Sequence, residues 1–335
     1  MSTRVRPATR TWIPVLLALI CSIANAQTSI EPTIVNPGAR SLSLGGAFVA
    51  VADDATAAWV NPSGLTQLVR PEVSLDLRGW IDDRGGIVEN LSGLGFVSFV
   101  LPQDRWAAAV YGQTLASADF TDTLAIPGEI SLGSSLTVVN LGVSASLHLS
   151  DDLSIGLGLT TYAGTFDDDD VTVSSPLSFD NDVETEVGAT AGILWSPGEA
   201  WAFGASFRSG ADLVFDSGSR ANLPDTTAAG VRWRSAGGSA TIAAELEHLS
   251  GFESRTRAHV GSEWVFLKAT PLIGLRAGAW YDPCSRADDS GCSGGDGVFH
   301  LSGGVGVAWK RFQLDIGGDA SDRTAIISFS GIFTF

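Results

Sequence analysis

The chain has 335 residues, of which only 17% are charged, and its formal net charge is −17 at pH 7. Soluble proteins average about 25% charged residues, so an ordinary cytosolic enzyme is disfavoured. A nucleic-acid partner is also disfavoured, because phosphate binding needs a basic face. Mean hydropathy is +0.20, yet beyond residue 26 no stretch approaches the roughly 20 apolar residues of a membrane helix. The composition therefore excludes a helical membrane protein.

Residues 1–26 have the features of a secretory signal. Three arginines precede an apolar run from Trp12 to Ile23. The tripeptide Ala24-Asn25-Ala26 then satisfies the small-x-small cleavage rule. We expect cleavage before Gln27 and export of the remaining chain.

The next segment, residues 27–71, shows no strand-like alternation. Asp53 or Asp54 can cap a short helix over residues 55–59. Pro62 prevents that helix from continuing, and Gly64 allows a turn. The segment is too apolar for a free tail, so we expect it to be buried against the rest of the chain.

From residue 72 onward, apolar residues alternate with small or polar ones, as at Leu153, Ile155, Leu157 and Leu159. Successive strand side chains point to opposite faces, so one face of each segment is apolar. Fourteen such segments begin near Glu72, Gly93, Arg105, Leu136, Leu153, Glu184, Trp201, Asp225, Ala240, Arg255, Thr270, Val298, Arg311 and Thr324. The second segment breaks the alternation, which predicts a bulge or kink there.

The connections differ in length according to strand parity. Those after even-numbered segments are short, as at residues 150–152, whereas several after odd-numbered segments are long, namely 81–91, 113–135, 164–183, 209–224 and 282–297. Outer-membrane barrels have short periplasmic turns and long external loops. The pattern predicts an all-β fold: a 14-stranded antiparallel transmembrane β-barrel over residues 72–335, with residues 27–71 as an N-terminal hatch in the lumen.

Aromatic residues fit the same architecture. Tryptophans fall near segment ends, where an aromatic girdle is expected: Trp106, Trp195, Trp201, Trp233, Trp264 and Trp309. The chain ends in Phe333 and Phe335, which resemble the terminal aromatic residues that the barrel assembly machinery reads. An ordinary amphipathic edge strand is the alternative for this last segment.

The N-terminal segment carries a recognisable motif. Gly45, Gly46, Asp53 and Asp54 are followed by Asn61-Pro62-Ser63. This pattern resembles the start of the FadL/TodX superfamily, which includes related PorV-type barrels. The resemblance implies a fourteen-stranded barrel whose hatch carries an Asn-Pro-Ala motif, with Ser63 departing at the third position. It implies passive uptake of hydrophobic small molecules, either long-chain fatty acids or hydrocarbons. The alternative is a PorV-like protein that binds exported proteins without transport.

Following the alternation inward gives a polar cluster in the lumen, because the lipid face disfavours arginine by about 2–4 kcal/mol at the midplane. Its members are Arg232, Arg234, Glu245, Glu247, Arg255, Arg257, His259, Glu263 and Arg276. One interpretation is a carboxylate-binding station for an amphipathic ligand. The other is a mutually neutralised network that fills the lumen and anchors the hatch.

Other candidate sites carry weaker signals. His300 and Ser302 share the inner face, as a histidine and the serine it activates would. The sequence indicates no third orienting group, and no nucleophile elbow is present. We therefore expect no enzyme activity and no cofactor. A run of four acids could bind calcium but is more typical of a solvated loop: Asp167, Asp168, Asp169 and Asp170.

The two cysteines of the mature chain, Cys284 and Cys292, are expected to form a loop disulfide after export. A metal pair is the alternative, although no histidine lies between them.

These patterns together predict a multi-pass β-barrel in the outer membrane of a Gram-negative type bacterium. The expected partners are outer-membrane lipid, the barrel assembly machinery and a hydrophobic small molecule. Nucleic acid is not expected, and the barrel is predicted to be a monomer.

Overall fold

The computed structural model describes residues 29–32, 34–83, 87–124, 130–169, 182–216, 219–251, 254–283, 297–322 and 324–335. The signal segment 1–26, Asp170, Cys284 and Cys292 lie outside these residues. The side chains of Asp167 to Asp169 also lie outside the description, although their backbone ends a strand. The predictions for these residues therefore stay predictions.

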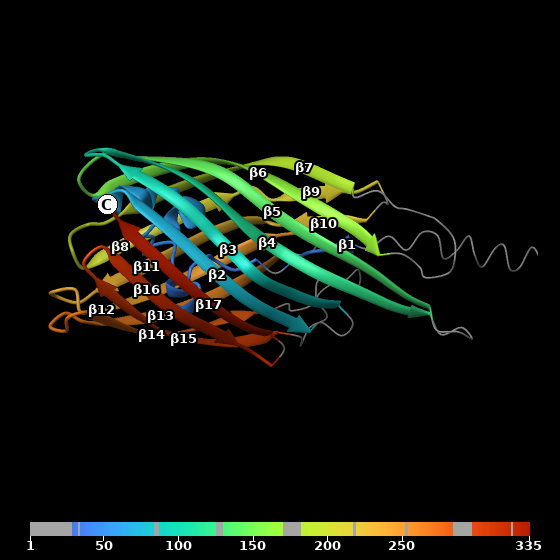
Figure 1. Ribbon diagram of the computed structural model, residues 1–335. Helices are drawn as coiled ribbons and strands as arrows, with labels where there is room; N and C mark the ends of the chain where they lie inside the picture. The colour runs from blue at the N-terminus through green and yellow to red at the C-terminus, as the bar shows by residue number, and fades with distance from the viewer. Residues whose placement is uncertain are drawn as a thin grey trace, which may run out of the picture.

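Within the described residues, fourteen strands close into one antiparallel barrel (Figure 1). They are β2 (Glu72–Asp83), β3 (Ile87–Pro102), β4 (Trp106–Leu124), β5 (Ile130–His148), β6 (Leu153–Asp169), β7 (Asp182–Trp195), β8 (Trp201–Arg208), β11 (Asp225–Arg234), β12 (Ala240–Ser250), β13 (Ser254–Phe266), β14 (Leu272–Asp282), β15 (Val298–Trp309), β16 (Phe312–Ala320) and β17 (Thr324–Thr334). Strand β17 pairs with β2 and closes the ring. The predicted 14-stranded barrel is confirmed.

The alternation sorts side chains between the two faces of the wall. On β6, Leu157 and Leu159 are 67% and 60% exposed on the outside, whereas Thr160 and Tyr162 are buried on the inside. The same apolar outer face recurs around the ring, and closure leaves the barrel without a strand edge. Such an outer surface is suited to lipid, because strand pairing around the closed ring satisfies most backbone groups of the wall.

No helix among the described residues is long and apolar enough to cross a membrane.

The short turns and the aromatic residues gather at one end of the barrel. All six tryptophans of the predicted girdle lie at or near strand termini on the side of the short turns. At the same end Phe333 packs against Phe312 and Phe335, with ring centroids 4.9 Å apart in both pairs. The Phe335 amide donates to the Pro71 carbonyl at 3.0 Å. The chain terminus is thereby joined to the residues that precede the first wall strand.

Three connections differ from the sequence-based expectation. The predicted loop over residues 81–91 is largely strand, because β2 runs on to Asp83 and β3 already begins at Ile87. The predicted loop over residues 113–135 is largely strand, because β4 runs on to Leu124 and β5 already begins at Ile130. Cross-strand pairing continues there, for example between Thr123 and Ser131. The apolar alternation that marks a lipid-facing strand is lost in this polar stretch, so the sequence pattern alone did not reveal it.

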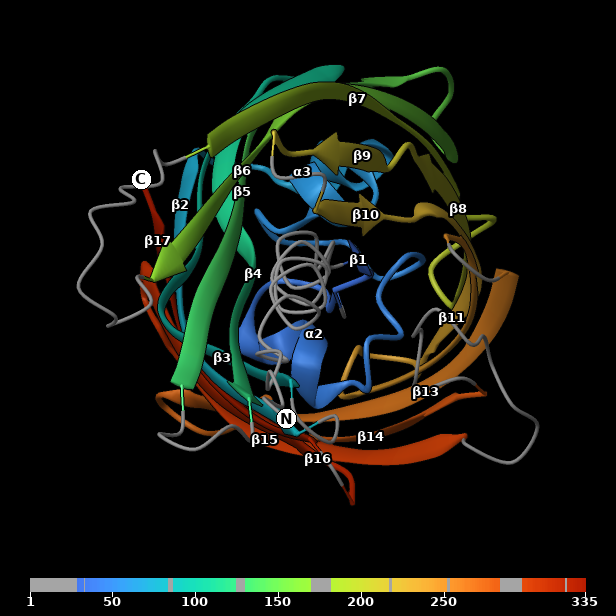
Figure 2. The same ribbon diagram turned by 90° about the vertical axis from the view of Figure 1, so that its right-hand side faces the viewer.

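The third difference is at residues 209–224, which do not form an external loop. They hold two short strands, β9 (Ala211–Val214) and β10 (Arg220–Leu223), which lie inside the ring of wall strands (Figure 2). Strand β10 pairs in parallel with β1 (Ser29–Ile30) at the start of the described chain. The segment turns inward because it carries an apolar face, Leu213 and Phe215, that is buried against the wall.

Residues 34–71, hereafter the N-terminal segment, also lie inside the ring (Figure 2). They contain α2 (Ala39–Ser43), α3 (Ala57–Val60) and the 3-10 helix η1 (Pro62–Gln67). Their large apolar side chains, among them Phe48, Trp59 and Leu65, are fully buried. The segment thus occupies the lumen, whereas its movement as a hatch stays a prediction.

Close approach to the wall explains the paired glycines after α2. Gly45 and Gly46 adopt φ values of 64° and 79°, a region that L side chains rarely adopt. A Cβ added to Gly45 would lie 2.8 Å from backbone atoms of Ala279 on β14. The turn after α2 therefore contacts the wall backbone directly.

The two ends of the barrel can be assigned to the two sides of the membrane. The turn at Asp151 lies at the short-turn end, and the turn at Asp322 lies at the opposite end. In a background without Cys284 and Cys292, Asp322→Cys is expected to react with a membrane-impermeant thiol reagent on intact cells. Asp151→Cys is expected to react only after the outer membrane is permeabilised. Labelling of Asp151→Cys on intact cells would reverse the assignment.

Candidate functional site

The lumen has two chemically different halves. The wall from β3 to β6 presents buried side chains that carry no charge. Many are apolar or aromatic, namely Phe96, Val100, Tyr111, Leu115, Leu136, Val138, Tyr162 and Phe166, and others are polar, namely Ser98, Gln113, Asn140, Ser144, Ser146, Ser154 and Thr160. The wall from β12 through β17 to β2 presents mostly charged or polar ones: Glu245, Glu247, Arg255, Arg257, Glu263, Arg276, Asp315, Asp319, Asp76 and Arg78. The N-terminal segment lies between these halves and contacts both.

One ion-pair network is centred on Arg40 of α2. Its guanidinium donates to both carboxylate oxygens of Glu263 at 3.0 Å each, a bidentate pair. Arg40 also pairs with Asp53, which accepts a further hydrogen bond from Arg234 at 3.1 Å. On the wall side, Arg276 donates to Glu263 at 2.7 Å. Glu263 and Asp53 thus each accept from two arginines, and the network joins the N-terminal segment to β11, β13 and β14.

The charge states of this network follow from its surroundings. Burial lowers the pKa of Arg40, but the carboxylates of Asp53 and Glu263 outweigh it and hold that pKa well above its usual value. Burial likewise favours a neutral Asp53, yet the adjacent Arg40 guanidinium keeps the pKa of Asp53 below its usual value. Burial raises the pKa of Asp54, which lies farther from Arg40. The Arg40–Asp53 contact is therefore a pair of opposite charges.

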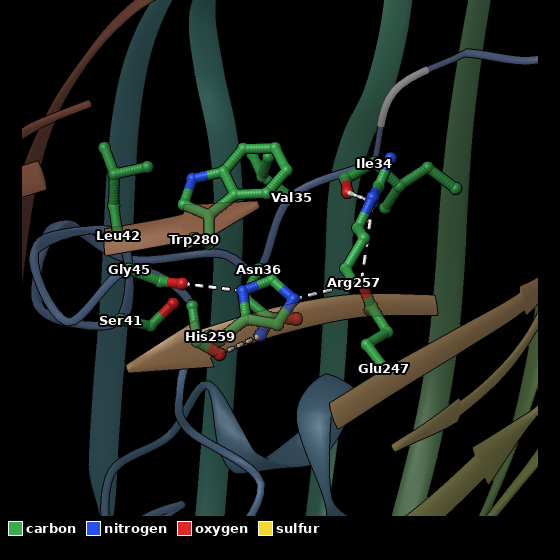
Figure 3. Close-up of a pocket in the computed structure, with 11 residues that line it drawn as sticks. Ile34, Val35, Asn36, Ser41, Leu42, Gly45, Glu247, Arg257, His259 and Trp280 are labelled. Atoms are coloured by element: carbon green, nitrogen blue, oxygen red, sulfur yellow. Dashed lines mark hydrogen bonds and ion pairs between the residues drawn. The ribbon is translucent and has the colours of Figure 1, made fainter. Parts of the chain in front are cut away.

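A second network surrounds a small cavity between the turn after α2 and the wall (Figure 3). His259 of β13 contacts the Gly45 carbonyl through Nδ1 at 2.7 Å, so this nitrogen must carry the proton. Its Nε2 lies 3.6 Å from Glu247, which also accepts from Arg257 at 3.5 Å. The cavity has a volume of about 20 Å³, room for roughly one water molecule.

The His300 environment differs from the sequence-based expectation. Asp319 is a third orienting group, because it hydrogen-bonds His300 Nδ1 at 2.8 Å and accepts from Trp280 Nε1 at 2.9 Å. The Trp280 ring stacks on His300 with centroids 3.6 Å apart. No hydrogen bond joins His300 to Ser302 in the described residues, and the Ser302 hydroxyl is buried without a partner. Asp319 and Trp280 thus hold the imidazole in place.

The predicted lumen cluster is held mainly by contacts to the N-terminal segment and to the residues just before it. Glu245 accepts from the Phe48 and Val49 amides at 2.7 Å each. Arg255 pairs with Glu31, and Arg257 donates to the Ile34 carbonyl at 3.4 Å. Arg232 differs from these residues, since it is buried and has no ion pair among the described residues. The network therefore ties the lumen contents to the wall, in keeping with the anchoring interpretation.

The Asn61-Pro62-Ser63 motif also meets the wall. The Asn61 amide nitrogen donates to the Val49 carbonyl at 2.8 Å and to Ile193 of β7 at 3.2 Å. Its carbonyl oxygen accepts from the Ser63 hydroxyl at 2.6 Å and from the Ser63 amide at 3.3 Å. Asn61 thereby satisfies backbone groups at the start of η1 and links three parts of the lumen.

Removal of this side chain should loosen the segment locally. Asn61→Ala leaves the buried Val49 carbonyl without this partner, which costs about 1–3 kcal/mol. We expect faster amide hydrogen exchange at residues 49–64, with unchanged exchange in the wall strands. Asn61→Asp serves as a control that keeps the acceptor but loses the donor. Unchanged exchange in Asn61→Ala would show that the motif does not hold the segment.

The wall itself is interrupted between β3 and β4. Pairing stops after Glu89 and resumes at Phe96, so residues 90–95 of β3 face residues 114–117 of β4 out of register. The Thr114 hydroxyl donates to the Leu94 carbonyl at 3.1 Å across this interval. The consecutive residues Leu115 and Ala116 are both buried, which breaks the in-out alternation. The predicted irregularity of the second strand thus corresponds to a break in the backbone ladder.

A groove of about 800 Å³ lies on the outer face of β3 to β8. Its lining includes Phe99, Leu157 and Phe207, which are exposed, and small residues such as Ala108 and Ala145. These side chains point away from the lumen, so the groove belongs to the lipid-facing surface and not to a path through the barrel.

Sequence reasoning missed several inward polar residues. Asp76 accepts from Arg78 at 3.1 Å and from the Gly38 amide at 3.4 Å, and Asp315 pairs with Arg276. Arg208 stacks over the Trp59 ring at 4.0 Å. Period-two alternation places all of these on the inner face, so the signal was present. Among the described residues, no group of three His, Cys, Asp or Glu side chains is arranged to hold a metal ion.

A closed 14-stranded barrel with an apolar outer face and a filled lumen defines an outer-membrane β-barrel. No protein-family model and no curated protein matches the chain.

Solved structures do match over nearly the whole chain. The CymD monoaromatic hydrocarbon channel is 15% identical, with a TM-score of 0.68, covering 91% of this chain and 99% of that one. The Pseudomonas putida toluene transporter TodX is 13% identical, with a TM-score of 0.68 and coverages of 90% and 99%. A Pseudomonas aeruginosa FadL homologue is 12% identical, with a TM-score of 0.64 and the same coverages. The resemblance to FadL/TodX barrels is thus confirmed at the level of the fold.

Proposed function

We propose that the chain lets hydrophobic small molecules cross the outer membrane without an energy source. The substrates are hydrocarbons or long-chain fatty acids. The observation that carries this proposal is the break in β3–β4 pairing, which lies beside the aromatic half of the lumen. Phe96 and Leu115 at the edges of the break belong to the buried apolar cluster that lines this half.

The route follows from these positions. A ligand enters from the loop end, moves along the apolar inner face of β3 to β6, and leaves sideways between β3 and β4 into the lipid. Lateral exit suits a hydrophobic molecule, because it passes from an apolar lumen to the apolar membrane core without entering water. The lumen is filled by the N-terminal segment and by β9–β10, so these elements must rearrange during passage.

The neighbours in fold support a hydrophobic substrate, since they include a monoaromatic hydrocarbon channel and a toluene transporter. The alternative, a PorV-like barrel that binds exported proteins, has no comparable support among the described residues or the comparisons.

The test is uptake by cells whose outer membrane is otherwise poorly permeable to these compounds. Expression of the chain should speed entry of labelled toluene, labelled oleate or both. Glucose uptake through the general porins serves as the control and should not change. The absence of any increase for a panel of hydrocarbons and fatty acids, with the barrel correctly folded, would contradict the proposal.

A further inference from the structure

The charged residues at the short-turn end of the barrel are separated by sign. From β13 around the ring to β2, the turns and the residues before β2 carry four exposed cations: Lys268, Lys310, Arg311 and Arg70. The turns after β5 and β7, on another part of the ring, carry three exposed acids: Asp151, Asp152 and Glu199. Both lysines of the chain thus lie on one side, in a protein whose formal net charge is −17.

The four cations follow one another along the rim. Strands β14 and β15 pair directly, so the β13–β14 and β15–β16 turns are neighbours. The Thr334 amide donates to the Arg311 carbonyl at 2.9 Å, and the Phe335 amide donates to the Pro71 carbonyl at 3.0 Å. These bonds bring Arg311, the chain terminus and Arg70 together. We call Lys268, Lys310, Arg311 and Arg70 the basic arc, which stays positive even with the terminal carboxylate.

The basic arc has charge available for an external anion. Within the described residues, no acidic side chain forms an ion pair with any of its four cations. The arginines of the lumen differ in this respect, since Arg40, Arg257 and Arg276 all pair with carboxylates of the chain.

Lys310 occupies a backbone position that lysine rarely takes. Trp309 pairs with Phe312, so Lys310 and Arg311 form a two-residue turn. The φ angle of Lys310 is 55°, in the left-handed region where glycine or asparagine is usual in such turns. The turn geometry therefore does not explain the choice of lysine, and the side chain is the part to account for.

The Lys310 ammonium lies on the membrane side of the wall and not over the lumen. Its Nζ is 5.0 Å from the centre of the Trp309 ring, a cation–π contact. Trp309 and Phe312 are 56% and 57% exposed on the outer face of the barrel. Tryptophan at the end of a membrane strand lies at the level of the lipid headgroups. The ammonium is therefore in the layer that contains the lipid phosphates.

We propose that the basic arc binds the phosphate of an anionic phospholipid, such as phosphatidylglycerol, in the leaflet that meets the short-turn end. Lys310 and Arg311 bind the phosphate through charge-assisted hydrogen bonds. The Trp309 and Phe312 rings contact the glycerol and the first acyl carbons.

The surroundings of the cations favour a lipid. Clusters of lysine and arginine at a membrane surface attract anionic lipids. A soluble acidic partner is less suited, because the rings beside these cations lie at the level of the headgroups. The acids Asp151, Asp152 and Glu199 repel the same lipid from their part of the rim. This lipid site is independent of the proposed uptake function.

The test compares phosphatidylglycerol with phosphatidylcholine, which has a phosphate and a glycerol but no net charge. Native mass spectrometry counts the lipids bound to the full-length protein in detergent, with both lipids at the same concentration. We expect the wild type to favour phosphatidylglycerol by at least about tenfold. The double variant Lys310→Asn with Arg311→Gln should lose that preference. Asparagine suits the φ angle of position 310, so the turn is kept.

Single variants separate the basic arc from a general effect of charge. Arg311→Gln should reduce the preference by about fivefold. Arg105→Gln is the matched control, because it also removes an exposed arginine from a short turn, but one that lies beside Asp104 and outside the basic arc. It should retain the preference. High salt should weaken the preference of the wild type, because exposed charges are screened. Heat-modifiable migration verifies that each variant is folded.

Several outcomes would overturn the proposal. Equal binding of the two lipids by the wild type would do so, and would assign the basic arc to a soluble acidic partner instead. A preference that survives in the double variant would also contradict it, as would an equal loss in Arg105→Gln. Displacement of the lipid by glycerol 3-phosphate at the same concentration would show a site for a free phosphate group and not for a lipid.

Discussion

A disulfide between β3 and β4 is expected to reduce uptake of hydrophobic compounds by at least about tenfold, because gating motions of this kind control passage. The variant carries Leu94→Cys and Thr114→Cys in a background without Cys284 and Cys292. The Thr114 hydroxyl already reaches the Leu94 carbonyl at 3.1 Å, so the two backbones lie close across the break in pairing. A disulfide needs Cα atoms about 4.4–6.8 Å apart. Once formed, it holds together the strands that must separate for lateral exit.

Reduction of the bridge should restore uptake in the same cells, which separates a closed exit from a damaged barrel. The matched control is Ala145→Cys with Leu157→Cys, a directly paired position on β5 and β6 with an intact ladder. Oxidation of that pair should leave uptake unchanged. If the oxidised 94–114 variant transports as fast as its reduced form, the ligand does not leave between β3 and β4.

Strand positions were predictable because lipid imposes a strict in-out alternation on the wall. Predicted starts at Glu72, Leu153, Trp201 and Val298 coincide with β2, β6, β8 and β15. The prediction failed where the sequence loses this alternation. β4 runs on to Leu124 and β5 begins at Ile130 through a stretch rich in polar residues, so period-two reasoning did not detect these strand extensions.

The inward fold of residues 209–224 was hidden for a different reason. β9 and β10 are four residues each, and their partner β1 lies at the other end of the sequence. Parallel pairing between such distant segments leaves no local signature. The sequence signal for burial was the apolar pair Leu213 and Phe215. Large apolar side chains are usually buried, whereas exposed loops are mostly polar.

The candidate site was predictable only as a set of inward charges. Alternation put Glu263 and Glu245 in the lumen, but their partners, Arg40 and the amides of Phe48 and Val49, belong to the N-terminal segment. Arg208 was on the inner face of the pattern as well. Its contact with the Trp59 ring depends on the folded path of α3. Contacts across the lumen could not be predicted from the sequence, because the partners lie far apart in the chain and no fixed spacing relates them.

Arg40→Ala is expected to release the N-terminal segment from the wall. The Arg40 side chain is 12% exposed and forms ion pairs with Glu263 and Asp53, whose side chains are also largely buried. After removal of Arg40, Glu263 keeps Arg276 and Asp53 keeps Arg234 as a partner. The expected cost is therefore at the lower end of the about 3–5 kcal/mol for breaking a buried ion pair. That penalty falls on the docked segment and not on the wall, whose strands pair with their neighbours around the closed ring.

The measurement is limited proteolysis of the purified barrel. Cleavage within residues 34–71 should become at least about a hundredfold faster in Arg40→Ala, since each 1.4 kcal/mol is a factor of ten in the open population. Uptake of toluene should also rise. Heat-modifiable migration should stay as in the wild type, because the wall strands keep their pairing.

Two further variants sharpen the result. Arg40→Lys keeps the charge but cannot form the two parallel hydrogen bonds to Glu263, so it should be intermediate. Arg220→Ala removes an ion pair with Asp212 at 3.6 Å whose side chains are 51% and 46% exposed. Such exposed pairs contribute about 0–1 kcal/mol, so this variant should resemble the wild type. A segment in Arg40→Ala that resists the protease as well as the wild type would show that contacts other than this network hold it. The hydrogen bonds of Asn61 and Glu245 would then be the next to remove.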